Sequence, residues 1–104
     1  MQDFTNKIAV VTGGGTGMGR ELVCQLIGAG AHVAMCDVAP ENMAETQRLA
    51  SALGTGRLTS HLCDVSSEFD VLRFRDEVAE QHDTSHINLL FNNAGIAGGG
   101  SVID

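Results

Sequence analysis

A glycine-rich stretch near the N-terminus carries the residues best suited to chemistry. Residues 12–19 read Thr-Gly-Gly-Gly-Thr-Gly-Met-Gly, and they join an apolar run at 7–12 to a segment with helical periodicity. A turn of this kind between a strand and a helix lets backbone N–H groups approach a phosphate closely, and the helix N-terminus adds partial positive charge. The stretch therefore predicts a site for the phosphates of a nucleotide.

Three other interpretations of this stretch are weaker. No register of it places three glycines as in the pattern Gly-x-Gly-x-x-Gly. A P-loop fits Gly14 to Gly19, but it then requires Lys and Ser or Thr where this chain has Arg20 and Glu21, so ATP and GTP are disfavoured. A tight turn that binds nothing is also disfavoured, because five glycines in seven positions cost stability without a gain in packing.

Two aspartates follow apolar runs farther along the chain. Asp37 stands 18 residues after Gly19 and ends the run at 31–36, where an acid can accept hydrogen bonds from the hydroxyls of an adenosine ribose. The alternative for Asp37 is a solvated turn residue. Asp64 ends a similar run at 58–63, and for Asp64 a role in the turn before a helix is an equal alternative.

An amide-rich segment, Asn92-Asn93-Ala94-Gly95, follows a further apolar run at 87–91. It supplies hydrogen-bond donors and acceptors beside a glycine. We expect it at the same edge of the fold as the other polar residues.

The elements that must position these residues alternate regularly. Strands are predicted at 7–12, 31–36, 58–63 and 87–91. Helices are predicted from Met18 to a stop at Gly28, from Pro40 to about Gly54, and after a cap at Ser66 or Ser67. Such alternation forces parallel strands with right-handed crossovers, so we expect a doubly wound, Rossmann-like α/β sheet. The strand order expected for such a sheet is 3-2-1-4. Both aspartates then emerge at its carboxyl edge.

Composition excludes several classes of protein. The formal charge of −7 disfavours binding to nucleic acid or to anionic lipid. No apolar stretch is long enough to span a bilayer and the N-terminus does not resemble a secretory signal, so a cytoplasmic location is expected. Cys24, Cys36 and Cys63 lack metal-ligand spacing and are predicted as free thiols, and the scattered histidines do not predict a metal site.

Taken in order, these motifs resemble the short-chain dehydrogenase/reductase family. The resemblance rests on Thr-Gly-x-x-x-Gly-x-Gly at 12–19, the acid at 37, Asp-Val at 64–65 and Asn-Asn-Ala-Gly at 92–95, and it covers the chain from Phe4 onward. It implies a set of residues that bind NAD: Gly13, Thr16, Gly17, Met18 and Gly19 at the phosphates, Asp37 at the adenine ribose, Asp64 and Val65 beside adenine, and Asn93, Ala94 and Gly95 at the nicotinamide-side ribose. It also implies that Asn92 and its neighbours hold the central strand.

The family's catalytic residues are not found in this chain. They comprise a Tyr-x-x-x-Lys pair, a preceding Ser and an Asn, whereas this chain has no tyrosine and only Lys7 as a lysine. Residues 1–104 are therefore expected to be a dinucleotide-binding domain that is incomplete at its C-terminus, ends after its fourth strand and is inactive alone.

The resemblance implies that the intact protein transfers hydride between NAD(H) and a secondary alcohol or ketone. It also implies a small-molecule substrate and a homo-oligomer when the protein is complete. A non-catalytic NAD-binding module is the alternative. NAD is expected over NADP, because Asp37 would repel a 2′-phosphate and neither Thr16 nor Val38 is basic.

Overall fold

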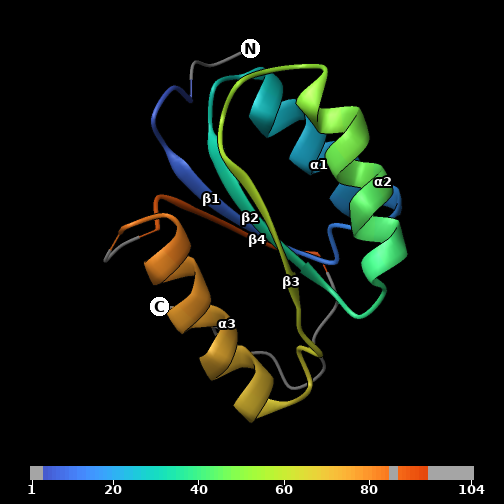
Figure 1. Ribbon diagram of the computed structural model, residues 1–104, viewed down its shortest axis with the longest axis vertical. Coiled ribbons are helices and arrows are strands. Elements are labelled where there is room, and N and C mark those ends of the chain that lie inside the picture. The colour runs from blue at the N-terminus through green and yellow to red at the C-terminus, as the bar shows by residue number, and fades with distance from the viewer. Residues whose placement is uncertain (1–3, 85–86, 94–104) are drawn as a thin grey trace.

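The structure is a computed structural model that describes residues 4–84 and 87–93. Strands and helices alternate along the chain: β1 (Ile8–Thr12), α1 (Gly17–Gly28), β2 (His32–Asp37), α2 (Pro40–Ser51), β3 (Leu58–Leu62), α3 (Glu68–Gln81) and β4 (Leu89–Asn92). The four strands form one parallel sheet in the order β3-β2-β1-β4, which confirms the predicted architecture. Helices α1 and α2 lie together on one side of the sheet and α3 lies on the other (Figure 1).

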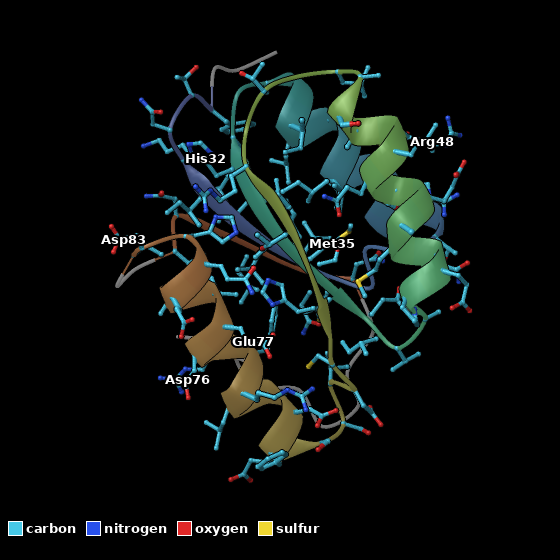
Figure 2. All side chains as sticks on the ribbon, viewed as in Figure 1. His32, Met35, Arg48, Asp76, Glu77 and Asp83 are labelled. Atoms are coloured by element: carbon cyan, nitrogen blue, oxygen red, sulfur yellow. The ribbon has the colours of Figure 1, made fainter. Side chains whose placement is uncertain are left out.

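Alternation along the inner strands divides the core into two apolar layers. Ala9, Val11, Val33 and Met35 face α1 and α2, and all four are fully buried. Figure 2 places Met35 between the sheet and these helices. The intervening residues face α3, where the core cluster consists of Val10, Ala34, Cys36, Cys63, Phe74 and Val78. Strands β1 and β2 are buried along almost their whole length, as expected for strands whose sheet is covered by helices on both faces.

The cysteine prediction is confirmed in this second layer. Cys24, Cys36 and Cys63 are all free thiols, and the last two are buried in the cluster under α3. Burial raises the pKa of the Cys36 thiol, and the adjacent Cys63 thiol raises it further. The two thiols lie next to each other, and the raised pKa of each keeps it protonated.

Several predicted boundaries differ from the structure by one to three residues, among them the start of β1, both ends of β2 and the start of α1. Helix α2 ends at Ser51, before Gly54, because the chain turns through Ala52 and Leu53, and Gly54 then meets the Ile27 carbonyl too closely for a side chain. Strand β3 ends at Leu62, one residue early. Strand β4 begins at Leu89, because Asn88 uses its side-chain Oδ1 to accept the Ile8 N–H at 2.9 Å before the ladder starts.

The register brings the predicted polar residues to one edge. Thr12 pairs with both Cys36 and Asn92, and Asp37 pairs with Leu62. The glycine-rich turn and the residues that follow β2, β3 and β4 therefore all lie at the carboxyl edge of the sheet, which is where this architecture binds ligands. None of the helices in the described part of the chain has the length and apolar character of a membrane span.

Candidate functional site

The glycine-rich turn is fastened to the end of β2. The N–H groups of Gly13 and Gly14 both donate to the Cys36 carbonyl, at 2.8 and 3.1 Å. Gly13 has φ 70°, a left-handed conformation that favours glycine. Where α1 begins, Gly19 packs directly on the Gly13 carbonyl, and a Cβ there would collide with it. The turn and the helix are thus held in backbone contact.

The N-terminus of α1 has no side-chain cap. Thr16 is the N-cap, yet its side chain makes no capping hydrogen bond, and the first turn of α1 contains no acidic residue. The first N–H groups of a helix have no partner within it. Thr16, Gly17 and Met18 are exposed, and Met18 is 71% exposed. The arrangement can therefore accept an anion from solvent.

Asp37 is held rigidly beside this turn. Its Oδ2 accepts the Gly15 N–H at 2.9 Å, and its Oδ1 accepts the N–H groups of Val38 at 2.7 Å and Ala39 at 3.3 Å. A carboxylate offers about four acceptor sites, so these contacts leave room for one further donor on Oδ2. A Cβ on Gly15 would lie 2.7 Å from that oxygen, so this close approach requires glycine.

Asp64 lies at the same edge but mainly serves its own turn. Its Oδ1 accepts from the Ser66 hydroxyl at 2.7 Å and from the Ser66 N–H at 2.9 Å, and these bonds lower the pKa of the Asp64 carboxyl. The turn leads into α3, whose N-cap is Ser67, with its side chain accepting the Asp70 N–H. Val65 is half-buried and packs on the cluster under α3.

The two asparagines after Phe91 tie β4 to the glycine-rich turn. The Thr12 hydroxyl donates to Asn92 Oδ1 at 3.1 Å, and Asn93 Nδ2 donates to the Gly13 carbonyl at 3.3 Å. The structure thus brings Asn93 to the glycine turn beside Gly19. Ala94 and Gly95, which the sequence also predicts at this site, lie outside the described residues.

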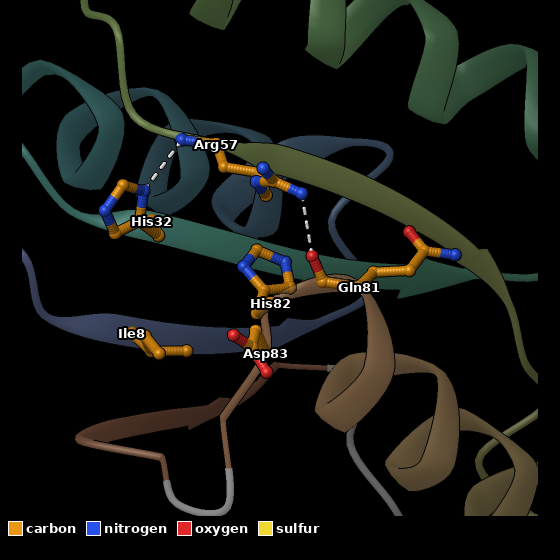
Figure 3. Close-up of a pocket in the computed structure, with 6 residues that line it drawn as sticks. All are labelled: Ile8, His32, Arg57, Gln81, His82 and Asp83. Atoms are coloured by element: carbon orange, nitrogen blue, oxygen red, sulfur yellow. Dashed lines mark hydrogen bonds between the residues drawn. The ribbon is translucent and has the colours of Figure 1, made fainter.

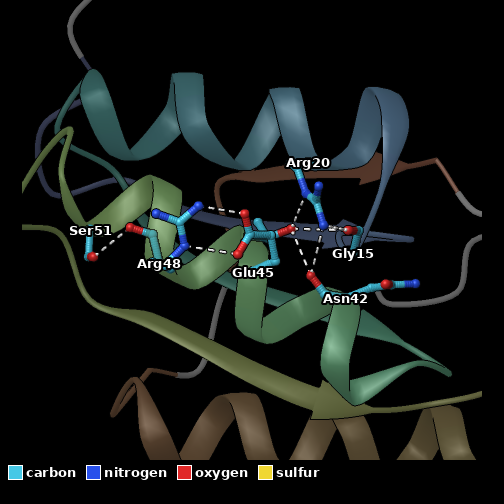
Figure 4. A network of polar contacts seen from close by, with 7 residues as sticks. Gly15, Arg20, Asn42, Glu45, Arg48 and Ser51 are labelled. Carbon is cyan, nitrogen blue, oxygen red and sulfur yellow. Dashed lines mark hydrogen bonds and ion pairs between the residues drawn. The ribbon is translucent and has the colours of Figure 1, made fainter.

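The sequence did not reveal the role of Arg20. Its guanidinium turns toward α2, where it donates to the Thr46 hydroxyl and to the carbonyls of Gly15 and Asn42 (Figure 4). Thr46 is completely buried and contacts the Gly14 carbonyl at 2.9 Å. In a P-loop a lysine would stand at this position; here the basic side chain binds protein carbonyls instead.

A second polar region, which the sequence did not predict, lies on the side of the sheet that α3 covers. His61 is buried beneath α3, with its Nδ1 2.7 Å from Glu77 Oε1 and its Nε2 2.7 Å from the Thr59 hydroxyl. The same hydroxyl is 2.7 Å from His82 Nε2. Figure 2 shows Glu77 on the side of α3 that faces the sheet. The only indication in the sequence was that His61 lies within a predicted strand. Its contact with α3 becomes clear only in the structure.

His82 also borders a shallow cavity of about 260 Å³, which is lined by Ile8, His32, Arg57, Gln81, His82 and Asp83 (Figure 3). Arg57 ties its two sides together, because its N–H donates to His32 Nδ1 and its guanidinium donates to the Gln81 carbonyl. No set of side chains in the described ranges could hold a metal ion. This cavity is remote from the glycine-rich turn.

Comparison with known proteins agrees with this geometry. The profile of the short chain dehydrogenase family matches residues 7–104. An oxidoreductase of Mycobacterium tuberculosis, SadH, is 41% identical over 98% of this chain, which corresponds to 36% of the relative. The chain thus spans about a third of the length of the curated relatives that it matches.

Solved structures of the same family superpose closely. Levodione reductase matches 89% of this chain and 36% of its own, with a TM-score of 0.84 and 30% identity. An NAD⁺-bound xylitol dehydrogenase matches 91% of this chain and 35% of its own, at 0.83 and 30%. A metagenomic short-chain oxidoreductase in complex with NADP matches 88% of this chain and 40% of its own, at 0.79 and 32%.

Proposed function

Because this chain belongs to the short-chain dehydrogenase/reductase family, we propose that it holds NAD for an oxidoreductase acting on a secondary alcohol or ketone. The observation that carries the proposal is the pairing of an open helix N-terminus with a fixed carboxylate at one sheet edge. The first can take a diphosphate, and the second can take a ribose hydroxyl.

The residues present fit a dinucleotide. Gly13, Thr16, Gly17, Met18 and Gly19 would hold the phosphates at the uncapped N-terminus of α1, where a Cβ built on Gly17 would have no atom within 4 Å. Asp37 would accept a hydroxyl of the adenine ribose at its remaining acceptor site. Asp64 and Val65 would flank adenine, and Asn93 with Ala94 and Gly95 would line the nicotinamide-side ribose.

NAD is proposed over NADP on electrostatic grounds. Asp37 would face a 2′-phosphate with like charge, and the exposed Thr16 and Val38, which come from the two segments that form the site, are neutral. Arg20 would not bind the 2′-phosphate directly, because its guanidinium donates to the Thr46 hydroxyl and to the carbonyls of Gly15 and Asn42. Solved relatives bind either cofactor, as the NAD⁺-bound and NADP-bound structures illustrate.

The bound nicotinamide would accept or donate hydride, which is the chemistry that the cofactor supplies. The described residues contribute binding and orientation: they anchor the adenosine half and fix the direction in which the dinucleotide crosses the edge of the sheet. Small-molecule substrates and assembly into a homo-oligomer in the cytoplasm are part of the same proposal for the complete protein.

The test uses the complete protein that contains this chain. Calorimetric titration should give saturable NAD binding, and incubation with a panel of secondary alcohols should produce NADH, followed by its absorbance. Tight NAD binding without turnover of any alcohol or ketone would favour the non-catalytic NAD-binding module. Absence of NAD and NADP binding would contradict both functions.

A further inference from the structure

The carbonyl side of the glycine-rich turn is held by a clamp of two side chains, Arg20 of α1 and Thr46 of α2. Arg20 Nη2 donates to the Gly15 carbonyl at 2.5 Å and to the Asn42 carbonyl at 3.1 Å. Arg20 Nε donates to the Thr46 hydroxyl at 2.9 Å. One planar guanidinium therefore joins the turn to α2, as Figure 4 shows.

Thr46 completes the clamp from a fully buried position. Its hydroxyl lies 2.9 Å from the Gly14 carbonyl, 3.2 Å from that of Gly15 and 3.3 Å from that of Asn42. A hydroxyl has a single proton, so it donates best to the nearest acceptor, Gly14. Arg20 then serves Gly15, and two consecutive carbonyls of the turn are satisfied from the side of α2.

Gly15 transmits this constraint to Asp37. The carbonyl of Gly15 is bound by Arg20, and its N–H donates to Asp37 Oδ2. Any movement of Gly15 would therefore change the direction in which Asp37 presents its remaining acceptor site. Gly15 has little room to move, because a Cβ built on it would lie 2.7 Å from Asp37 Oδ2 and 2.9 Å from Asn42 Cβ.

We propose that Arg20 is a positioning residue, which fixes Gly15 and through it the Asp37 carboxylate, and so sets the preference between a ribose 2′-hydroxyl and a 2′-phosphate. This inference rests on the proposed function. Arg20 acts on protein carbonyls and does not touch the cofactor. Lysine would not replace it, because an ammonium lacks the planar fork that reaches Thr46 and Gly15 together.

The test compares Arg20→Gln and Arg20→Lys with Arg48→Gln in the complete protein. Arg48 is the matched control, since it lies on α2 but pairs only with exposed Glu45. With all variants folded, titration with NAD and NADP should show that both Arg20 variants lose about tenfold in NAD affinity and less in NADP affinity. Thr46→Val should behave alike, and Thr46→Ser should restore the wild-type ratio.

A ligand-free measurement separates this inference from the proposed function. Hydrogen exchange at the Gly15 amide should be faster in both Arg20 variants than in wild type or Arg48→Gln, whether or not the protein binds NAD. If the Arg20 variants lower only the melting temperature and leave both Gly15 exchange and the NAD-to-NADP ratio unchanged, Arg20 is merely structural. Failure of wild type to bind NAD would overturn the proposed function, and Gly15 exchange would still decide the clamp.

Discussion

The Asp37 carboxylate combines two tasks, since it receives three backbone N–H groups and keeps one acceptor site toward solvent. A 2′-phosphate placed there would meet like charge in a half-buried site, a repulsion of about 2 kcal/mol or more. The complete protein should therefore bind NAD at least about 30-fold more tightly than NADP.

Asp37→Ala should narrow this gap by removing the charge, and Asp37→Asn should narrow it while keeping an acceptor for the Gly15 N–H. Dissociation constants measured by calorimetry for both cofactors check the prediction. Equal constants in the wild-type protein would show that Asp37 does not face the 2′ position.

Gly19 supports a second prediction at the residue scale. A Cβ at this position meets the Gly13 carbonyl, so Gly19→Ala must move the backbone of the turn or of α1. We expect a loss of about 1–3 kcal/mol in the free energy of unfolding, together with a loss of NAD affinity of at least about tenfold.

Gly28→Ala is the matched control, because a Cβ there has its nearest neighbour at an ordinary 3.8 Å. Chemical denaturation and NAD titration of both variants check the comparison. If Gly19→Ala matches Gly28→Ala in both measurements, the close contact between turn and helix has no functional importance.

At the scale of elements, the packing of α3 against the sheet makes stability depend on pH. The pKa of His82 is lowered from 6.5 to about 4, mainly by burial and in addition by the neighbouring His61, Arg57 and His32. A lowered histidine pKa means that protons bind the unfolded chain preferentially. The contribution is complete above about pH 6.5 and is lost as the pH falls toward 4.

Since His82 is only half-buried, we expect wild type to lose about 1 kcal/mol of unfolding free energy to this group between about pH 7.5 and about pH 5. Urea denaturation at both pH values measures the loss. His82→Gln keeps an amide that can bond Thr59 but does not titrate, so its stability should fall less with acid. Parallel pH curves for the two proteins would contradict the prediction.

Some features of this fold could be predicted from the local sequence. The periods of apolar residues predicted all seven elements, and Ser67 was one of the two predicted caps of α3. The strand order expected for a doubly wound sheet of this family is also confirmed. The position of Asp37 at the carboxyl edge of the sheet followed from its place at the end of the second predicted strand. These features depend on residues close in sequence or on general rules of parallel sheets.

What could not be predicted depends on contacts between distant elements. Arg20 and Thr46 are 26 residues apart and meet only because α1 packs beside α2. Thr59 and His82, 23 residues apart, meet only because α3 packs on β3. Neither pair has a spacing that suggests a contact, so the clamp and the contact between Thr59 and His82 could be found only in the structure.

At the scale of the whole molecule, β4 lies at one edge of the described sheet and is less covered than its neighbour β1. Its residues are alternately half-buried and exposed, and Leu90 is 36% exposed, whereas β1 and β2 are almost wholly buried. An apolar edge of this kind is a template for pairing with another chain. We therefore expect the 104-residue polypeptide, produced alone, to self-associate or aggregate and to bind NAD weakly.

Sedimentation velocity measures the association. Leu90→Lys places a charge on β4 and should shift the polypeptide toward monomer, whereas Leu53→Lys, at an exposed residue of the turn after α2, should not. A stable wild-type monomer with micromolar NAD affinity would instead identify residues 1–104 as a self-sufficient domain and favour the binding-module alternative.

The anchoring of the glycine-rich turn has a kinetic consequence. The turn is bound through N–H groups to Cys36 and through carbonyls to Thr46 and Arg20 without any ligand, so little conformational entropy remains to be lost when a diphosphate arrives. Binding of adenosine diphosphate to the complete protein should then be a single step in stopped-flow fluorescence. The observed rate should rise linearly with ligand concentration, without the plateau that a slow rearrangement of the turn would impose.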